Sequence, residues 1–112
     1  MRVKVSKQHV LRDNYRVLSV GYCELRGLLK NSRSNLYSSG VYGWACDYYE
    51  FDGLVISTGY SPIGSSIDYK IIRSYEAKAD KINYDVNLSW EQREKKLANL
   101  LNKFIKEVKE LI

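Results

Sequence analysis

The chain has 112 residues, of which 45% are apolar, 28% charged and 12% aromatic, and its net charge is +5. This composition is that of a globular protein and excludes a disordered chain, which would be poorer in aromatic residues. No apolar run approaches the ~20 residues that cross a bilayer, and the basic N-terminus lacks the apolar segment of a signal peptide. We therefore expect a single soluble domain over residues 1–112, in the cytoplasm.

The first forty residues predict short elements joined by polar loops. Residues 6–13 fit a short helix capped by Ser6, and residues 15–20 alternate as a strand does. Leucines at helical spacing predict a second short helix over residues 22–30. Residues 31–40 are mostly Ser, Asn and Gly, which predicts a loop.

A β-hairpin is the clearest element in the sequence. Residues 41–51 and 54–59 are rich in aromatic and β-branched side chains, as strands are. Between them, Asp52-Gly53 is the preferred sequence for a two-residue type I′ turn. This turn places Phe51 opposite Leu54.

Two C-terminal helices are predicted, over about residues 66–83 and 89–111. The second begins with a capping box formed by Ser89 and Gln92. Apolar residues recur at helical spacing along both helices: Ile67, Ile71, Ile72, Tyr75, Ala79 and Ile82 in the first, and Trp90, Leu97, Leu101, Phe104, Val108 and Leu111 in the second. The width of the second stripe favours packing on a sheet, and a homo-oligomer through this helix is the alternative.

The order of these elements predicts an α+β fold. We expect a small antiparallel sheet built around the hairpin, with short N-terminal helices and two C-terminal helices.

Charge is unevenly distributed along the chain. Residues 1–40 hold eight Lys/Arg and two acids, whereas residues 41–66 hold three acids and no Lys or Arg. Such a basic excess suits an anionic partner, such as nucleic acid, a nucleotide or an acidic protein. An ordinary solvated surface is the alternative explanation.

Neither catalysis nor metal binding is indicated by the sequence. His9, Cys23 and Cys46 are too few and too scattered for a zinc site, and the cysteines are better interpreted as buried free thiols than as a disulfide. Asp47 has no second carboxylate beside it for acid–base chemistry, and no phosphate-binding glycine motif occurs. We predict a protein that is not an enzyme and needs no cofactor.

The open end of the hairpin is the predicted ligand site. The turn register places Asp47 opposite Thr58, with small residues beyond them that leave a gap. Aromatic rings nearby can stack on a nucleobase, and arginines from the preceding segment can bind its phosphates. Ordinary cross-strand packing is the alternative. The predicted binding residues are Tyr42, Trp44, Asp47, Tyr48, Thr58, Tyr60, Arg26 and Arg33.

Residues 40–49 (GVYGWACDYY), Asp52-Gly53 and residues 58–64 (TGYSPIG) together resemble a group of small proteins from phages and prophages of Gram-positive bacteria. Their signature reads GVYGWNxDxY, a DG-type turn, then TGYRPxG. The chain departs from it at Ala45, where the group has Asn, and at Ser61, where it has Arg. The missing arginine removes from that loop a side chain that could donate hydrogen bonds to a phosphate.

The resemblance implies a role for the chain in the host bacterial cell. Phage proteins of this size often counter host defences, and some sequester cyclic nucleotide signals, as Thoeris anti-defence proteins do. We therefore expect a non-enzymatic protein that binds a small anionic nucleotide. The alternatives are a protein inhibitor of a host defence nuclease, of the anti-CRISPR type, and a small nucleic-acid-binding phage protein.

Overall fold

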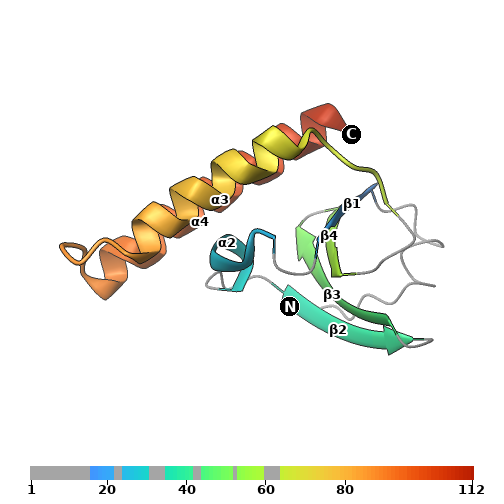
Figure 1. Cartoon of the computed structure of the whole chain (residues 1–112), viewed down its shortest axis with the longest axis horizontal. Coiled ribbons are helices and arrows are strands. Elements are labelled where there is room, and N and C mark those ends of the chain that lie inside the picture. Colours follow the sequence, from blue (N-terminus) through green and yellow to red (C-terminus); the bar gives the residue numbers. More distant parts are fainter. Residues whose placement is uncertain (1–15, 22–23, 31–34, 42–43, 52, 60–63) are drawn as a thin grey trace. The chain divides into compact units, whose positions relative to one another are not determined.

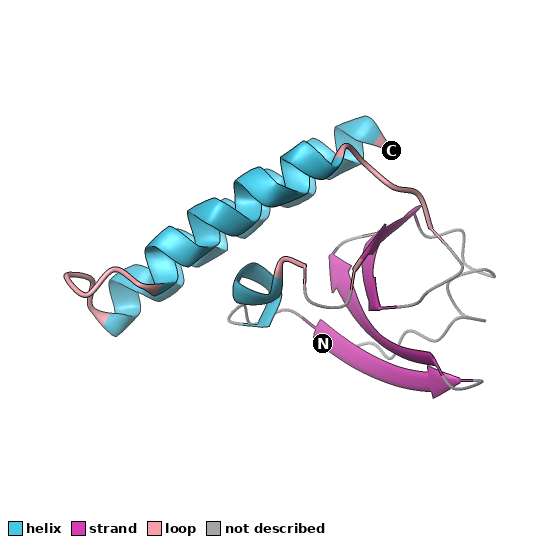
Figure 2. Cartoon of the chain, viewed as in Figure 1, coloured by secondary structure: helices cyan, strands magenta, loops and turns pink. Residues whose placement is uncertain are grey.

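The computed structural model describes residues 16–21, 24–30, 35–41, 44–51, 53–59 and 64–112. Within this part the fold is mixed α+β, as expected (Figure 2). The residues form two compact units: a sheet unit drawn from residues 1–24 and 34–66, and a helical unit drawn from residues 25–33 and 67–111. The helix predicted over residues 6–13 lies outside the described residues.

One sheet contains the strands β1 (Arg16–Val20), β2 (Asn35–Val41), β3 (Trp44–Phe51) and β4 (Leu54–Gly59), in the order β1-β4-β3-β2 (Figure 1). β4 and β3 are antiparallel, as are β3 and β2. β1, however, lies parallel to β4. The sheet is therefore mixed, and the prediction of an antiparallel sheet was wrong at this strand. Parallel neighbours need a long crossover connection, which local sequence patterns do not reveal.

The pairing of β3 with β4 has the register that a two-residue turn requires. Phe51 lies opposite Leu54, and the same register places Asp47 opposite Thr58. Gly53 has a φ of 84°, which glycine adopts without strain. β4 is the buried centre of the sheet unit, because every residue from Leu54 to Thr58 is at most 4% exposed.

The strand β2 occupies a segment for which a loop was predicted. Its residues from Asn35 to Val41 pair with β3 along their whole length. Ser, Asn and Gly have a low intrinsic preference for strands, but pairing with a neighbour overrides this preference. Composition was therefore a poor guide to this segment.

The helical unit consists of α2 (Arg26–Lys30), α3 (Tyr69–Asn83) and α4 (Trp90–Leu111). α3 and α4 lie side by side (Figure 1), and both contact α2. Leu25 precedes α2 with a φ of 55° and donates its backbone N–H to Glu76 Oε1 at 2.7 Å. The buried side chains of this unit are Leu25, Leu28, Leu29, Ile72, Tyr75, Ala79, Leu97, Leu100, Leu101, Phe104 and Val108.

The capping box predicted for the last helix is confirmed. Gln92 N–H donates to Ser89 Oγ at 3.2 Å, and Ser89 N–H donates to Gln92 Oε1 at 2.9 Å. The preceding helix begins later than residue 66, because Asp68 is its N-cap and accepts a hydrogen bond from Lys70 N. Asp is a strong N-cap residue, so it competes effectively with the upstream serines. The short α2 likewise begins at Arg26 and not at residue 22.

The apolar stripe of α4 is buried in the middle and exposed at both ends. Leu97, Leu101, Phe104 and Val108 are buried as predicted, but Trp90 is 70% exposed and Leu111 52% exposed. Length explains the exposure of Trp90: α4 has 22 residues and α3 has 15, so the first turns of α4 extend past the end of α3. The predicted choice between packing on a sheet and forming an oligomer stays a prediction.

Tyr75 connects α3 to α4 through its ring and its hydroxyl. The ring meets Phe104 edge-on, with centroids 4.9 Å apart, and the hydroxyl donates to Glu107 Oε2 at 2.6 Å. Burial, and after it the hydrogen bond to Glu107 and the negative charge of Glu107, raise the pKa of Tyr75 to about 12. The hydroxyl is therefore held in its protonated form.

This raised pKa predicts a loss of stability in alkali. The unfolded chain releases the Tyr75 proton near pH 10, whereas the folded chain keeps it until about pH 12, so the free energy of unfolding falls between these values. Denaturant titrations from pH 8 to 12 should show this fall in the native chain and in Tyr84→Phe, whose ring is 81% exposed. In Tyr75→Phe, the part of this fall that comes from the Tyr75 hydroxyl should be absent. Parallel curves for all three proteins would contradict the assignment.

Candidate functional site

The predicted hairpin site lies only partly within the described residues. Asp47 and Thr58 are directly opposite in the backbone register, as the prediction requires. Trp44 and Tyr48 belong to β3, and Thr58 is 4% exposed. Backbone pairing alone does not establish a ligand-binding gap, which stays a prediction.

The remaining predicted binding residues divide into two groups. Tyr42, Tyr60 and Arg33 lie outside the described residues. Arg26 is the first residue of α2 and is exposed. Of the predicted arginines and aromatic rings, the structure describes Arg26 in the helical unit and Trp44 and Tyr48 in the sheet unit.

A groove of about 430 Å³ runs along α3 and α4 in the helical unit. We call it the lysine groove, because four of its lining residues are lysines. Its lining consists of Lys78, Lys81, Ile82, Asp85, Leu88, Lys96, Asn99, Leu100 and Lys103. The volume lies within the range of small-molecule binding sites.

The lysine groove concentrates positive charge. Residues 67–112 contain ten Lys/Arg and eight acids, a nearly balanced set. The groove lining takes four of the cations and only one acid, Asp85. Asp85 Oδ1 already accepts a hydrogen bond from the backbone N–H of Asn87 at 3.0 Å. Because like charges repel, the clustering of the four lysines does not favour folding. The cluster is, however, suited to binding an anion.

Apolar side chains lie among the lysines of the groove. Leu100 is 8% exposed, and Ile82 and Leu88 are half-buried. All four lysines are exposed, so their ammonium groups are accessible to a ligand. The groove therefore combines cations with an apolar surface, as sites for nucleotides do.

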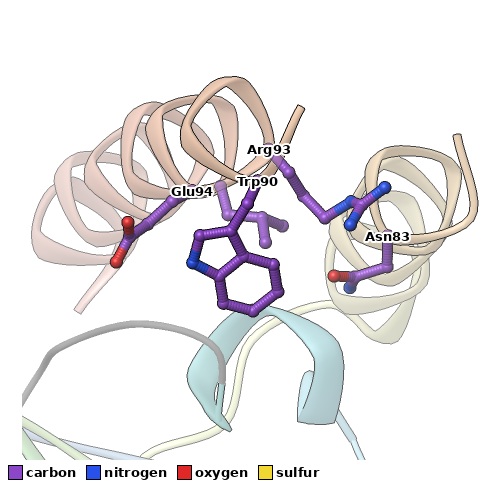
Figure 3. A pocket seen from close by; sticks show the side chains of 5 residues that line it. Asn83, Trp90, Arg93 and Glu94 are labelled. Atoms are coloured by element: carbon purple, nitrogen blue, oxygen red, sulfur yellow. The ribbon is translucent and has the colours of Figure 1, made fainter. Parts of the chain in front are cut away.

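A second, much smaller hollow lies where α3 ends and α4 begins. Figure 3 shows its lining, which comprises Asn83, Trp90, Arg93, Glu94 and Leu97. Arg93 Nη2 donates to the backbone oxygen of Asp85 at 2.9 Å, while its Nε is buried without a hydrogen-bond partner among the described residues. At about 30 Å³ the hollow has room for water and not for a nucleotide.

No group of three or more His, Cys, Asp or Glu side chains is placed to hold a metal ion within the described part of the chain. None of the helices described is both long enough and apolar enough to span a membrane.

Comparison with protein-family models, with curated proteins and with solved structures finds no significant match to this chain.

The lysine groove was not predicted from the sequence. Along the chain, the basic excess lies in the N-terminal third, far from the groove residues in sequence. The signal was present in the spacing: Lys78 and Lys81 are three residues apart, and Lys96 and Lys103 are seven apart, so each pair shares a helix face. The groove also depends on which face of α3 meets which face of α4, and this pairing is not contained in either spacing.

Proposed function

We propose that this chain is a non-enzymatic protein that binds and sequesters a small anionic nucleotide. The observation that supports the proposal is the lysine groove, which places four cations and one carboxylate around an apolar surface. The phosphates of the ligand bind the ammonium groups, and its base covers the apolar side chains. No acid–base pair is needed, because the ligand is held and not altered.

The sequence resemblance gives this binding its biological setting. In a phage protein, tight binding of a nucleotide signal would keep that signal from its receptor in the cytoplasm of the host cell. We therefore propose an anti-defence role, in which the amount of protein must match the amount of signal. The hairpin residues Trp44 and Asp47 remain a second predicted site for the same ligand class.

Protein inhibition is a second candidate function, favoured by one observation. Three large side chains near the turn between α3 and α4 are mostly exposed: Tyr84 by 81%, Val86 by 91% and Trp90 by 70%. Exposed aromatic and apolar groups of this kind often mark a protein interface. Such an inhibitor would bind its target through this end of the helical unit.

The proposed function can be tested with a panel of ligands. The purified full chain is incubated with AMP, cyclic AMP, cyclic di-AMP and ADP-ribose, separated from unbound ligand, heated and analysed for what it releases. We expect at least one of these nucleotides to be retained. Affinity should fall as salt is added, because exposed charges are screened.

A charge-matched pair of variants locates the site. Replacing the four groove lysines by glutamine should weaken binding about 100-fold, if each exposed charge contributes about 0.5–1 kcal/mol. The control replaces Lys70, Arg73, Lys95 and Lys106, which are equally exposed but do not line the groove. Equal weakening in both variants, or no binding of any nucleotide by the native chain, would refute the proposal.

A further inference from the structure

The contacts between α3 and α4 fix which of their residues lie at the same level. In the middle of α3, the Tyr75 ring packs against Phe104. At its end, Asn83 shares a hollow with Leu97. The helices are therefore antiparallel, and residues whose numbers add to about 180 lie opposite one another.

This alignment sorts the groove lysines into two pairs. Lys81 and Lys96 lie within about one helical turn of the same level, toward the α3–α4 turn. Lys78 and Lys103 lie similarly close in level, farther from that turn. Because seven residues separate Lys96 from Lys103, the groove presents cations over about 10 Å along α4.

Apolar side chains line the groove beside the two lysine pairs. Leu100 lies between Lys96 and Lys103 along α4, whereas Ile82 lies at the level of the Lys81–Lys96 pair. The Asn99 side chain adds an amide that can donate to or accept from a base. Lys78 also holds its ammonium group 5.1 Å from the centre of the Tyr75 ring, which favours one position for this cation. The two lysine pairs therefore have an apolar side chain between them on α4, and Asp85 and Leu88 line the groove beyond the pair nearer the α3–α4 turn.

We propose that the lysine groove binds a dinucleotide, meaning a ligand whose two phosphates are separated by a nucleoside. One phosphate binds Lys81 and Lys96, the other binds Lys78 and Lys103, and a base lies over Leu100. This inference rests on the proposed function and narrows its ligand class. The adjacent phosphates of a pyrophosphate share one bridging oxygen, so such a ligand engages one lysine pair well and leaves the other largely unused.

The test compares three probes by isothermal titration calorimetry on the full chain. Cyclic di-AMP carries two separated phosphates, ADP-ribose two adjacent ones, and AMP a single one. We expect cyclic di-AMP to bind at least roughly tenfold more tightly than either of the others, because it alone engages both lysine pairs.

Two double variants then probe the pairs separately. Lys81→Gln with Lys96→Gln, and Lys78→Gln with Lys103→Gln, should each weaken cyclic di-AMP binding roughly tenfold or more. Lys95→Gln with Lys106→Gln removes the same charge from exposed positions outside the groove and should change affinity less than about threefold.

The outcomes separate this inference from the proposed function. If AMP or ADP-ribose binds as tightly as cyclic di-AMP, the dinucleotide inference is wrong while nucleotide binding stands. If cyclic di-AMP is preferred but only one lysine pair matters, the two-phosphate arrangement is also wrong. If none of the probes binds, both proposals fail.

Discussion

Replacing Phe104 with alanine should lower the free energy of unfolding by about 3–5 kcal/mol. Phe104 is fully buried, and its ring meets Tyr75 of the neighbouring helix edge-on. The substitution removes the aromatic contact and leaves a cavity that the surrounding helices fill only in part. Because small proteins are stable by about 5–15 kcal/mol in total, this one change should remove a large part of the stability.

Chemical denaturation followed by circular dichroism measures this loss. Leu111→Ala is the matched control, because Leu111 lies on the same helix and the same stripe but is 52% exposed. We expect the control to cost less than about 1 kcal/mol, as surface substitutions do. Similar costs for the two variants would mean that α4 does not bury Phe104 as described.

Local sequence signals predicted the elements whose structure is determined locally. Asp52-Gly53 indicated the connection that leaves Phe51 opposite Leu54, and the Ser89–Gln92 capping box indicated where α4 begins. In each case the residues that carry the signal are within a few positions of the feature they determine. Periodicity likewise identified the buried middle of α4, since one helix face must meet a partner.

The features that sequence reasoning missed depend on distant pairings. β2 is a strand because β3 supplies its hydrogen bonds, whereas its own composition resembles a loop. β1 is parallel to β4 although 33 residues separate their ends. The lysine groove needs the antiparallel alignment of α3 and α4 before the four lysines fall along one surface. Each of these features depends on two segments that are distant in the sequence, so no single stretch of sequence predicts it.

Gly64 shows how one position can combine backbone strain with close packing. Its φ of 121° is a conformation that side-chain-bearing residues rarely adopt. Its neighbour Ser65 pairs with β1 in both directions, through Ser65 N to Val17 O at 2.8 Å and Ser19 N to Ser65 O at 2.9 Å. A Cβ added at Gly64 would lie 3.0 Å from Val17 Cγ1 and 3.2 Å from the backbone N of Ser19. Glycine at position 64 is therefore required by the close approach of Gly64 and Ser65 to β1.

Gly64→Ala should accordingly destabilise the sheet unit more than Gly53→Ala does. Both positions have a positive φ, so both substitutions carry a strain of about 1–2 kcal/mol. A Cβ at Gly53 meets nothing within 4 Å, whereas a Cβ at Gly64 crowds β1, which adds about 1–3 kcal/mol. Hydrogen exchange of the Ser19 and Ser65 amides measures the difference directly, because these amides form the pairing that the added methyl group displaces. We expect faster exchange at both amides in Gly64→Ala only. Equal exchange rates of these amides in the two variants would contradict this expectation. They would mean that β1 accommodates the added methyl group, and that the close packing of Gly64 is not needed for the pairing of Ser65 with β1.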